Sequence, residues 1–268
     1  MKVFVINLSR ASDRWAFTCE NLKSAGLEFV RVEAIDGSHL LLPHPNVSER
    51  GLRWMHGSKP NMALVGSYLS HLNALKQFLD SGDNFGVIAE DDIAPQDFCR
   101  KAIEESLEYA EYWDIVRLSG LRHIRMIRHF PIAGGRSLGV SLTRLTGAGA
   151  YLVNRNAAET MIQKLRVMKL PFDHAFDREW TWGLRAMVVF PFPFKQKFKK
   201  RLPSQISDHS RNFKYPALFR YWSVFPFRAY TEGSRLAFRS FLAFRMGRKI
   251  HPRASTKSEA PPPDGPGC

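Results

Sequence analysis

The sequence has few cysteines and no long apolar run. Its three cysteines, Cys19, Cys99 and Cys268, are far apart and odd in number, which excludes a disulfide framework and a zinc site with paired spacing. No segment reaches the roughly 18 apolar residues of a membrane-spanning helix, and the apolar start at 3–8 is too short for a signal peptide. We therefore expect a cytoplasmic protein in a reducing compartment, without a membrane span.

Acidic residues are scarce in one part of the chain. Residues 195–253 hold 15 lysines and arginines against Asp208 and Glu232. Residues 1–194 hold 23 basic and 21 acidic residues, so almost all of the net charge of +14 belongs to the later segment. A near-neutral body with a basic segment predicts that this segment meets an anionic surface.

The length of 268 residues is sufficient for one large domain with an extension. We expect a folded domain at 1–206 and a basic, aromatic-rich extension at 207–268. From about residue 254 the extension is rich in proline and glycine, a composition typical of disorder.

Apolar patterning predicts an α/β fold with a mixed sheet flanked by helices, because β-branched runs alternate with segments of helical period. The first two strands and the helix between them, which Ser12 is expected to cap, predict a parallel βαβ unit. The loop predicted at 38–62 is long enough to cover a ligand. The expected strands are 2–8, 29–35, 85–90, 113–118, 150–153 and 186–190, with a hairpin around Gly134-Gly135; the expected helices are 12–24, 65–79, 96–109, 154–165 and a short one from 171 that holds Trp180 and Trp182.

The stretch from Phe85 to Asp92 carries the strongest chemical signal. It reads Phe-Gly-Val-Ile-Ala-Glu-Asp-Asp, an apolar strand that ends in three carboxylates. Adjacent carboxylates raise one another's pKa unless a cation lies among them. Mg²⁺ or Mn²⁺ commonly joins one or two carboxylates to substrate phosphates. The stretch therefore predicts a metal–diphosphate site at the carboxyl edge of the sheet; the alternative is an acidic turn that caps the helix starting near Pro95.

Six segments, in order and spacing, resemble the lipooligosaccharide-type glycosyltransferases of family 25, whose bacterial members are galactosyltransferases and whose animal relatives act on collagen. The resemblance covers roughly 1–206. Leu64 stands where the family usually has an acid, which puts a donor contact in question, and Ser67 stands for a cysteine, which changes packing. The six segments are Phe4 to Leu8 with Arg10 and Asp13-Arg14, Glu33 to Gly37, Val65-Gly66 with Leu69 to Leu72, Ile88 to Asp92, Gly147 to Val153, and Pro171 to Asp173.

The resemblance implies an inverting GT-A-type transferase that uses UDP-galactose or a similar UDP-sugar together with Mn²⁺ or Mg²⁺. Loss of a diphosphate leaving group needs charge neutralisation, which the metal provides. Asp92 is the expected metal ligand, and Glu90 is expected to bind the metal, a metal-bound water or the donor ribose. Asp91 is expected to point to the other side.

Inversion also requires a base that takes the proton of the acceptor hydroxyl. Asp173 is the candidate, followed by Asp177. The alternative for Asp173 is a helix N-cap. His174 is expected to pack or face solvent.

The remaining candidates are expected around the donor nucleotide. Arginine suits phosphate through its planar fork of donors, although a solvated helix face remains an alternative. An acid at the end of the second strand suits a ribose hydroxyl, by analogy with other nucleotide folds. The helix beside the acidic strand either lines the donor pocket or makes a helix–sheet contact. These candidates are Asn7, Arg10 and Arg14 for phosphate, Asp36 for the ribose, and Ser70 and His71 on the helix.

The basic segment 195–253 interleaves aromatic and basic residues. This composition predicts an interfacial helix on anionic lipid, where each Lys or Arg near the surface adds roughly 1 kcal/mol. A lipid-linked oligosaccharide acceptor would suit that location, at the inner face of the bacterial inner membrane. A helical cap docked on the body is an alternative; nucleic acid is not expected, because no motif for it is visible.

The residues alone are also compatible with three other functions. Family members could transfer glucose or N-acetylglucosamine by the same mechanism. A non-catalytic member that binds through its basic tail would fit Leu64, whereas the intact Glu90-Asp91-Asp92 argues against it. A metal-dependent phosphohydrolase would need further Asp or His ligands at other strand ends.

Overall fold

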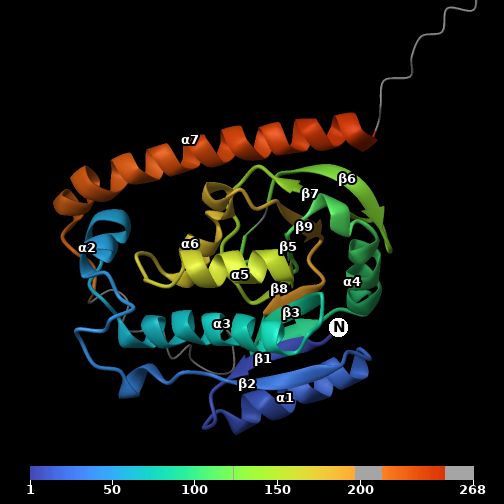
Figure 1. Cartoon of the computed structure of the whole chain (residues 1–268), viewed down its shortest axis with the longest axis horizontal. Helices are drawn as coiled ribbons and strands as arrows, with labels where there is room; N and C mark the ends of the chain where they lie inside the picture. Colours follow the sequence, from blue (N-terminus) through green and yellow to red (C-terminus); the bar gives the residue numbers. More distant parts are fainter. Residues whose placement is uncertain (123, 197–212, 251–268) are drawn as a thin grey trace, which may run out of the picture.

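The computed structural model describes residues 1–122, 124–196 and 213–250. Eight strands form one sheet in the order β2-β1-β3-β8-β5-β9-β7-β6 (Figure 1). Three pairings are parallel and four are antiparallel. The expected mixed α/β sheet flanked by helices is confirmed. The strands are β1 (Val3–Asn7), β2 (Phe29–Glu33), β3 (Phe85–Glu90), β5 (Ile115–Arg117), β6 (Met126–Ile132), β7 (Arg136–Ser141), β8 (Ala150–Asn154) and β9 (Ala186–Phe190).

The first half of the sheet is parallel. β1 lies between β2 and β3 and runs parallel to both. Helix α1 (Ser12–Ser24) joins β1 to β2, and α3 (Met62–Asp80) precedes β3. The carboxyl ends of β1, β2 and β3 therefore share one edge, which brings Asn7, Glu33 and Glu90 to the same side of the molecule.

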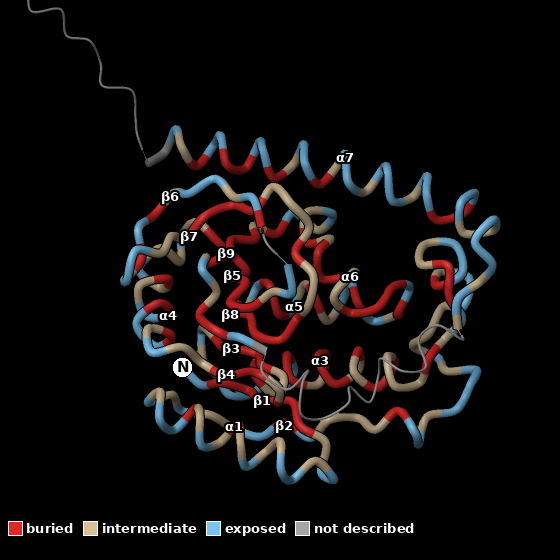
Figure 2. The backbone as a smooth tube through the Cα atoms, turned by 180° about the vertical axis from the view of Figure 1, so that it is seen from behind, coloured by how far each residue is buried: buried red, intermediate tan, exposed pale blue. Residues whose placement is uncertain are grey.

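Alternate residues of each strand enter two apolar clusters, one on each face of the sheet. Phe4 and Ile6 join the cluster under α3, α5 (Arg155–Lys164) and α6 (Phe172–Phe176). Val3 and Val5 join the other cluster, under α4 (Cys99–Glu108). This period of two is what a strand buried on both faces requires. Figure 2 shows the buried sheet between exposed helix surfaces.

Helix α7 (Ala217–Ile250) lies across one side of the body (Figure 1). Its buried Arg235 and Arg239 form ion pairs with the buried Asp177 at 3.1 and 3.0 Å. Arg239 also pairs with Glu179 at 2.7 Å. Removing one partner of such a buried ion pair typically lowers the free energy of unfolding by about 3–5 kcal/mol. The helical cap left open as an alternative is therefore present.

The outer face of α7 leaves large apolar side chains in solvent. None of the helices in the described ranges is long and apolar enough to span a membrane. The exposed apolar side chains of α7 are Leu218, Tyr221, Trp222, Phe225, Tyr230, Leu236, Phe241 and Phe244.

The segment expected to be a 25-residue loop is partly helical. It contains η1 (Gly37–His39), α2 (Glu49–Gly51) and η2 (Leu52–His56). The Ser48 hydroxyl accepts a hydrogen bond from Gly51 N at 3.0 Å and starts α2. Short polar-capped turns of this kind lack the long apolar period that identifies a helix in sequence.

Two further expectations about local structure were wrong. Ala11, not Ser12, occupies the N-cap of α1 and makes no side-chain cap bond. Trp180 and Trp182 lie in η4 (Glu179–Trp182), outside α6. Two elements had no counterpart among the expectations: a second sheet pairs β4 (Ile93–Pro95) with β10 (Phe194–Gln196), and η3 (Ala110–Tyr112) follows α4. The boundary expected at 206/207 and the segment 254–268 lie outside the described residues.

Candidate active site

Residues from three chain segments meet at the carboxyl edge of β1 and β3. Asn7 ends β1, and its side-chain amide donates to Asp91 Oδ2 at 2.6 Å. Arg14, on the first turn of α1, forms an ion pair with Asp91 and lies 3.9 Å from Asp92. The parallel pairing of β1 with β3 creates this contact between residues 84 positions apart. The fold thus brings Asn7 and Arg14 to the carboxylates, whereas their expected contact with a donor phosphate stays a prediction.

The carboxylates of Asp91 and Asp92 are held in unfavourable surroundings for negative charge. Burial and the charge of Glu90 raise the pKa of Asp92 to about 7, against the opposing effect of Arg14. Burial also raises the pKa of Asp91, although Arg14 and Asn7 oppose the shift. The Oδ1 atom of Asp92 is buried without a hydrogen-bond partner among the described residues. A cation beside Asp92 would relieve both the repulsion and the unmade bond.

The acidic stretch does not cap the helix after it. The N-cap of α4 is Phe98, which makes no side-chain cap bond. Asp91 and Asp92 instead form the turn between β3 and β4, and the Asp91 carbonyl accepts from the Thr18 hydroxyl at 2.9 Å. The alternative of an acidic helix cap is wrong.

His71 connects the acidic strand to α6. Its Nε2 lies 3.3 Å from Glu90 Oε1, and its Nδ1 lies 3.2 Å from the Tyr151 hydroxyl. Its ring stacks on Phe172, with centroids 3.9 Å apart and planes 4° apart. Phe172 precedes Asp173, so this stack brings the candidate base to the same region as Glu90. Tyr151 and Phe172 lay within the resemblance segments, but nothing in the sequence assigned them a role.

The other predicted donor contacts have protein partners. Asp36 pairs with Arg10 and accepts from Ser38 N at 2.9 Å. The Ser70 hydroxyl accepts from Ile35 N at 2.8 Å and donates to Gly66 O at 2.7 Å. Ser70 thus ties α3 to the end of β2, which corresponds to the helix–sheet alternative. Donor binding by Arg10 and Asp36 stays a prediction.

The two candidate bases have different surroundings. Asp173 lies in the first turn of α6 behind the N-cap Pro171, so its alternative as an N-cap is wrong. It is partly exposed, and its Oδ1 accepts from His174 N at 2.9 Å. Asp177 is buried, holds Arg235 and Arg239, and accepts from Leu145 N at 2.9 Å. These contacts leave Asp173 the freer of the two to meet a substrate.

Leu64 has apolar neighbours in the structure. It is partly buried and packs against the apolar cluster that contains Val65 and Leu72. An apolar residue suits this position, so Leu64 by itself gives no argument for an inactive protein.

The family model described as glycosyltransferase family 25 (LPS biosynthesis protein) matches residues 1–176, which include both the acidic strand and Asp173. The chain belongs to glycosyltransferase family 25. The expected family membership is confirmed, and all six quoted segments lie within the matched range.

Two curated relatives come from Xenopus laevis. Procollagen galactosyltransferase 1-B is 27% identical over 184 residues, and procollagen galactosyltransferase 1-A is 26% identical over 184 residues. Each alignment covers 64% of this family 25 chain and 30% of the relative. The chain thus spans less than a third of the length of these relatives.

A solved glycosyltransferase involved in the glycosylation of the major capsid of PBCV-1 is similar over 70% of this chain and 82% of its own. The sequence identity is 10% and the TM-score is 0.37. Similarity at this level supports no conclusion about function.

The residues at the carboxylate edge fit a divalent cation that is shared with a ligand. Within the described ranges no group of three or more His, Cys, Asp or Glu is placed to hold a metal by itself. Mg²⁺ and Mn²⁺ sites in nucleotide-binding proteins use one or two carboxylates and complete the shell with phosphates and water. The buried, unpartnered Oδ1 of Asp92 provides one such oxygen. The carboxylate of Glu90 is the candidate for a second.

Proposed function

We propose that this family 25 protein is a metal-dependent inverting glycosyltransferase that moves galactose from UDP-galactose to a lipooligosaccharide or lipopolysaccharide acceptor. The observation that carries the proposal is the buried, unpartnered Asp92 oxygen beside Glu90 and Arg14, within the segment that the family model matches. The names of the curated relatives support galactose as the sugar.

The chain's residues would divide the reaction between them. Asp92 and Glu90 would hold Mn²⁺ or Mg²⁺, which neutralises the charge of the departing diphosphate when bound. Arg14, beside Asp91 and Asp92, adds a fixed positive charge at the same edge. Asn7 and Asp91 fix each other through their hydrogen bond and orient the turn.

Asp173 would act as the general base. Its carboxylate takes the proton of the acceptor hydroxyl while that oxygen forms a bond to the anomeric carbon of galactose. The bond from the anomeric carbon to the β-phosphate oxygen breaks, and UDP leaves from the opposite face. The product has the inverted anomeric configuration.

The outer face of α7 would bind an anionic phospholipid surface at the inner face of the bacterial inner membrane. Trp222, Phe225 and the other exposed apolar side chains of this face suit the headgroup boundary. Glu232 is the one acidic residue of α7, and its carboxylate is occupied by Arg235 at 3.1 Å. The remaining charge of the helix is positive, as anionic lipid requires.

The proposal is tested by following UDP release from UDP-galactose with Mn²⁺ and a lipooligosaccharide acceptor, with UDP-glucose and UDP-N-acetylglucosamine in parallel. Acceptor-dependent release from UDP-galactose is the expected result. Release from one of the other two donors would change the sugar, and release from none, by folded protein, would contradict the proposed activity.

A further inference from the structure

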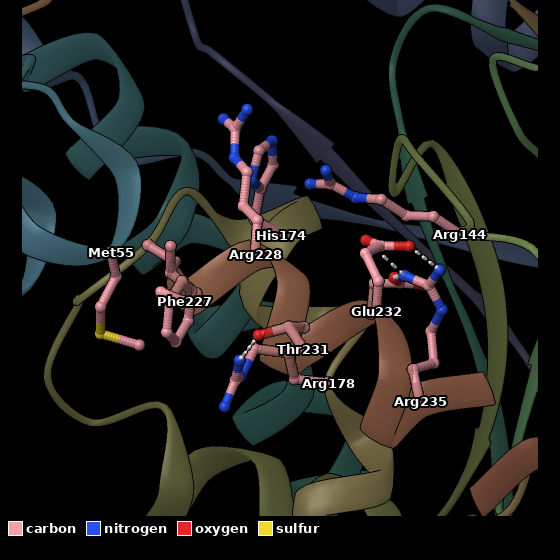
Figure 3. A pocket seen from close by; sticks show the side chains of 11 residues that line it. Met55, Arg144, His174, Arg178, Phe227, Arg228, Thr231, Glu232 and Arg235 are labelled. Atoms are coloured by element: carbon pink, nitrogen blue, oxygen red, sulfur yellow. Dashed lines mark hydrogen bonds and ion pairs between the residues drawn. The ribbon is translucent and has the colours of Figure 1, made fainter. Parts of the chain in front are cut away.

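A cavity lies beside α6, between Arg144 and α7. Figure 3 shows the side chains that line it. Arg144 reaches in from the loop, Arg228 and Thr231 come from α7, and His174 comes from α6. With Met55 from η2, the cavity is built by four segments that are far apart in the sequence.

The lining carries more positive than negative charge. Four arginines and two carboxylates line the cavity. Both carboxylates are already used: Asp177 pairs with Arg235 and Arg239, and Glu232 pairs with Arg235. The remaining arginines include Arg178, which donates to the Thr231 hydroxyl at 2.7 Å.

Arg144 and Arg228 are the other two arginines of the lining. In the described part of the chain neither makes a hydrogen bond or ion pair, whereas both guanidinium groups lie near the His174 ring (Figure 3). Burial and the charges of Arg144 and Arg220 lower the pKa of Arg228, against the opposing charge of Glu232. Two like charges held together without an anion are unfavourable, and a bound anion would remove the repulsion.

His174 provides a neutral wall for the cavity. Its ring packs edge-on against His56, with centroids 4.8 Å apart. Burial, together with Arg144 and Arg228, lowers the pKa of His174 despite the opposing charge of Asp173. At neutral pH the ring is therefore uncharged and offers a hydrogen-bonding nitrogen rather than a third positive charge.

The cavity adjoins the candidate base. His174 follows Asp173 and donates its backbone N–H to the Asp173 carboxylate at 2.9 Å. Asp177, one turn further along, is part of the lining. An anion bound by Arg144 and Arg228 would thus be held close to the hydroxyl that Asp173 deprotonates.

We propose that Arg144 and Arg228 form a binding subsite for a phosphate or carboxylate substituent on the acceptor glycan. Arginine forks bind both groups through paired N–H donors. The inference rests on the proposed transferase function and adds to it a class of acceptor: a negatively charged sugar, held by its anionic substituent on the acceptor side of the candidate base.

The test uses galactose 6-phosphate and galacturonate as probes, with galactose as the neutral reference, in calorimetric titrations of the full chain. We expect both anionic probes, or one of them, to bind at least tenfold more tightly than galactose. The same preference should be lost in Arg144→Gln and in Arg228→Gln. It should persist in Arg128→Gln, which removes an exposed arginine of β6. The stronger probe distinguishes phosphate from carboxylate.

Two further measurements separate this subsite from the donor site. Arg144→Lys and Arg228→Lys keep the charge and should retain part of the preference, whereas a folding defect would not respond to charge. UDP-galactose affinity with Mn²⁺ should be the same in the Gln variants as in the unchanged protein.

Equal binding of galactose and both anionic probes, or a preference unchanged in both Gln variants, would overturn the subsite. An anion preference that depends on both arginines, in a protein that binds no UDP-sugar, would leave the anion site standing and overturn its role in a transferase.

Discussion

The imidazole of His71 lies flat on the ring of Phe172, with the two planes 4° apart. One ring belongs to the helix before the acidic strand, and the other belongs to the residue before Asp173. The same imidazole lies 3.3 Å from Glu90. A single side chain therefore connects the candidate metal edge to the candidate base. We expect its removal to weaken donor binding.

Replacement of His71 by phenylalanine should weaken donor binding. The variant keeps a ring to stack on Phe172 but loses the contact with Glu90. A hydrogen bond to a charged group contributes about 1.5–3 kcal/mol, so we expect the KM for UDP-galactose to rise about tenfold or more. His39→Phe, at an exposed position, serves as the matched control. An unchanged KM in the His71 variant would remove His71 from the donor site.

Substitutions of the two candidate bases should have different effects, one on turnover and the other on stability. Asp173→Asn should lower kcat by about 10²–10⁴-fold, the usual contribution of a general base, and leave donor affinity and the melting temperature unchanged. Asp177→Asn should instead destabilise the fold by about 3–5 kcal/mol, because Arg235 and Arg239 would lose their buried partner. Full activity of Asp173→Asn, or a stable but inactive Asp177→Asn, would reverse the assignment.

Stability in acid should depend on Asp114. Burial raises its pKa, but hydrogen bonds from Arg185, including 2.9 Å to Oδ2, outweigh burial and leave the pKa below its ordinary value. A carboxyl with a lowered folded-state pKa stabilises the fold above its unfolded pKa, about 3.9, and this contribution disappears as the pH falls through the folded-state pKa.

Urea unfolding should therefore show a lower free energy of unfolding for Asp114→Asn at pH 7, and a difference that shrinks below about pH 4. Glu108→Gln, an exposed change on α4, should behave like the unchanged protein at both pH values. A difference that stays constant with pH would contradict the assigned pKa direction.

The outer face of α7 should bind anionic vesicles. Trp222→Ser with Phe225→Ser removes two exposed side chains without touching the body, and should reduce flotation with phosphatidylglycerol vesicles about tenfold or more. Leu41→Ser, on an exposed side chain elsewhere, is the control. Undiminished flotation of the double variant would mean that this face is not the anchor. Deleting α7 would be a poorer test, because Asp177 and Glu179 would lose their partners.

Much of the first half of the fold could be predicted from the sequence. The βαβ unit, α3 and the acidic strand have clear periods, and the expected helix at 154–165 is present as α5, with Asn154 as its N-cap accepting from Ala157 N at 2.8 Å. The meeting of Asn7 with Asp91 follows from two parallel strands. In each case the signal lies within one element or follows from one pairing rule.

The rest depends on contacts between distant segments. Arg235 and Arg239 are one helical turn apart, which indicates a shared face, but nothing in the sequence names Asp177 and Glu179 as their partners. The charge-based prediction for the basic tail thus missed that two of its cations are buried. For the same reason, only the structure shows that Arg144 and Arg228 line the same cavity.

The metal site at the end of β3 is tested most directly by calorimetric titration of UDP-galactose with and without Mn²⁺, on the unchanged protein, Asp92→Asn and Asp97→Asn. We expect metal-dependent binding that is at least tenfold weaker in Asp92→Asn and unchanged in Asp97→Asn, whose side chain is exposed. Binding that is independent of Mn²⁺, or equal in Asp92→Asn, would contradict the metal site at the end of β3. Absence of binding for UDP-galactose, UDP-glucose and UDP-N-acetylglucosamine alike, in folded protein, would contradict the UDP-sugar donor itself.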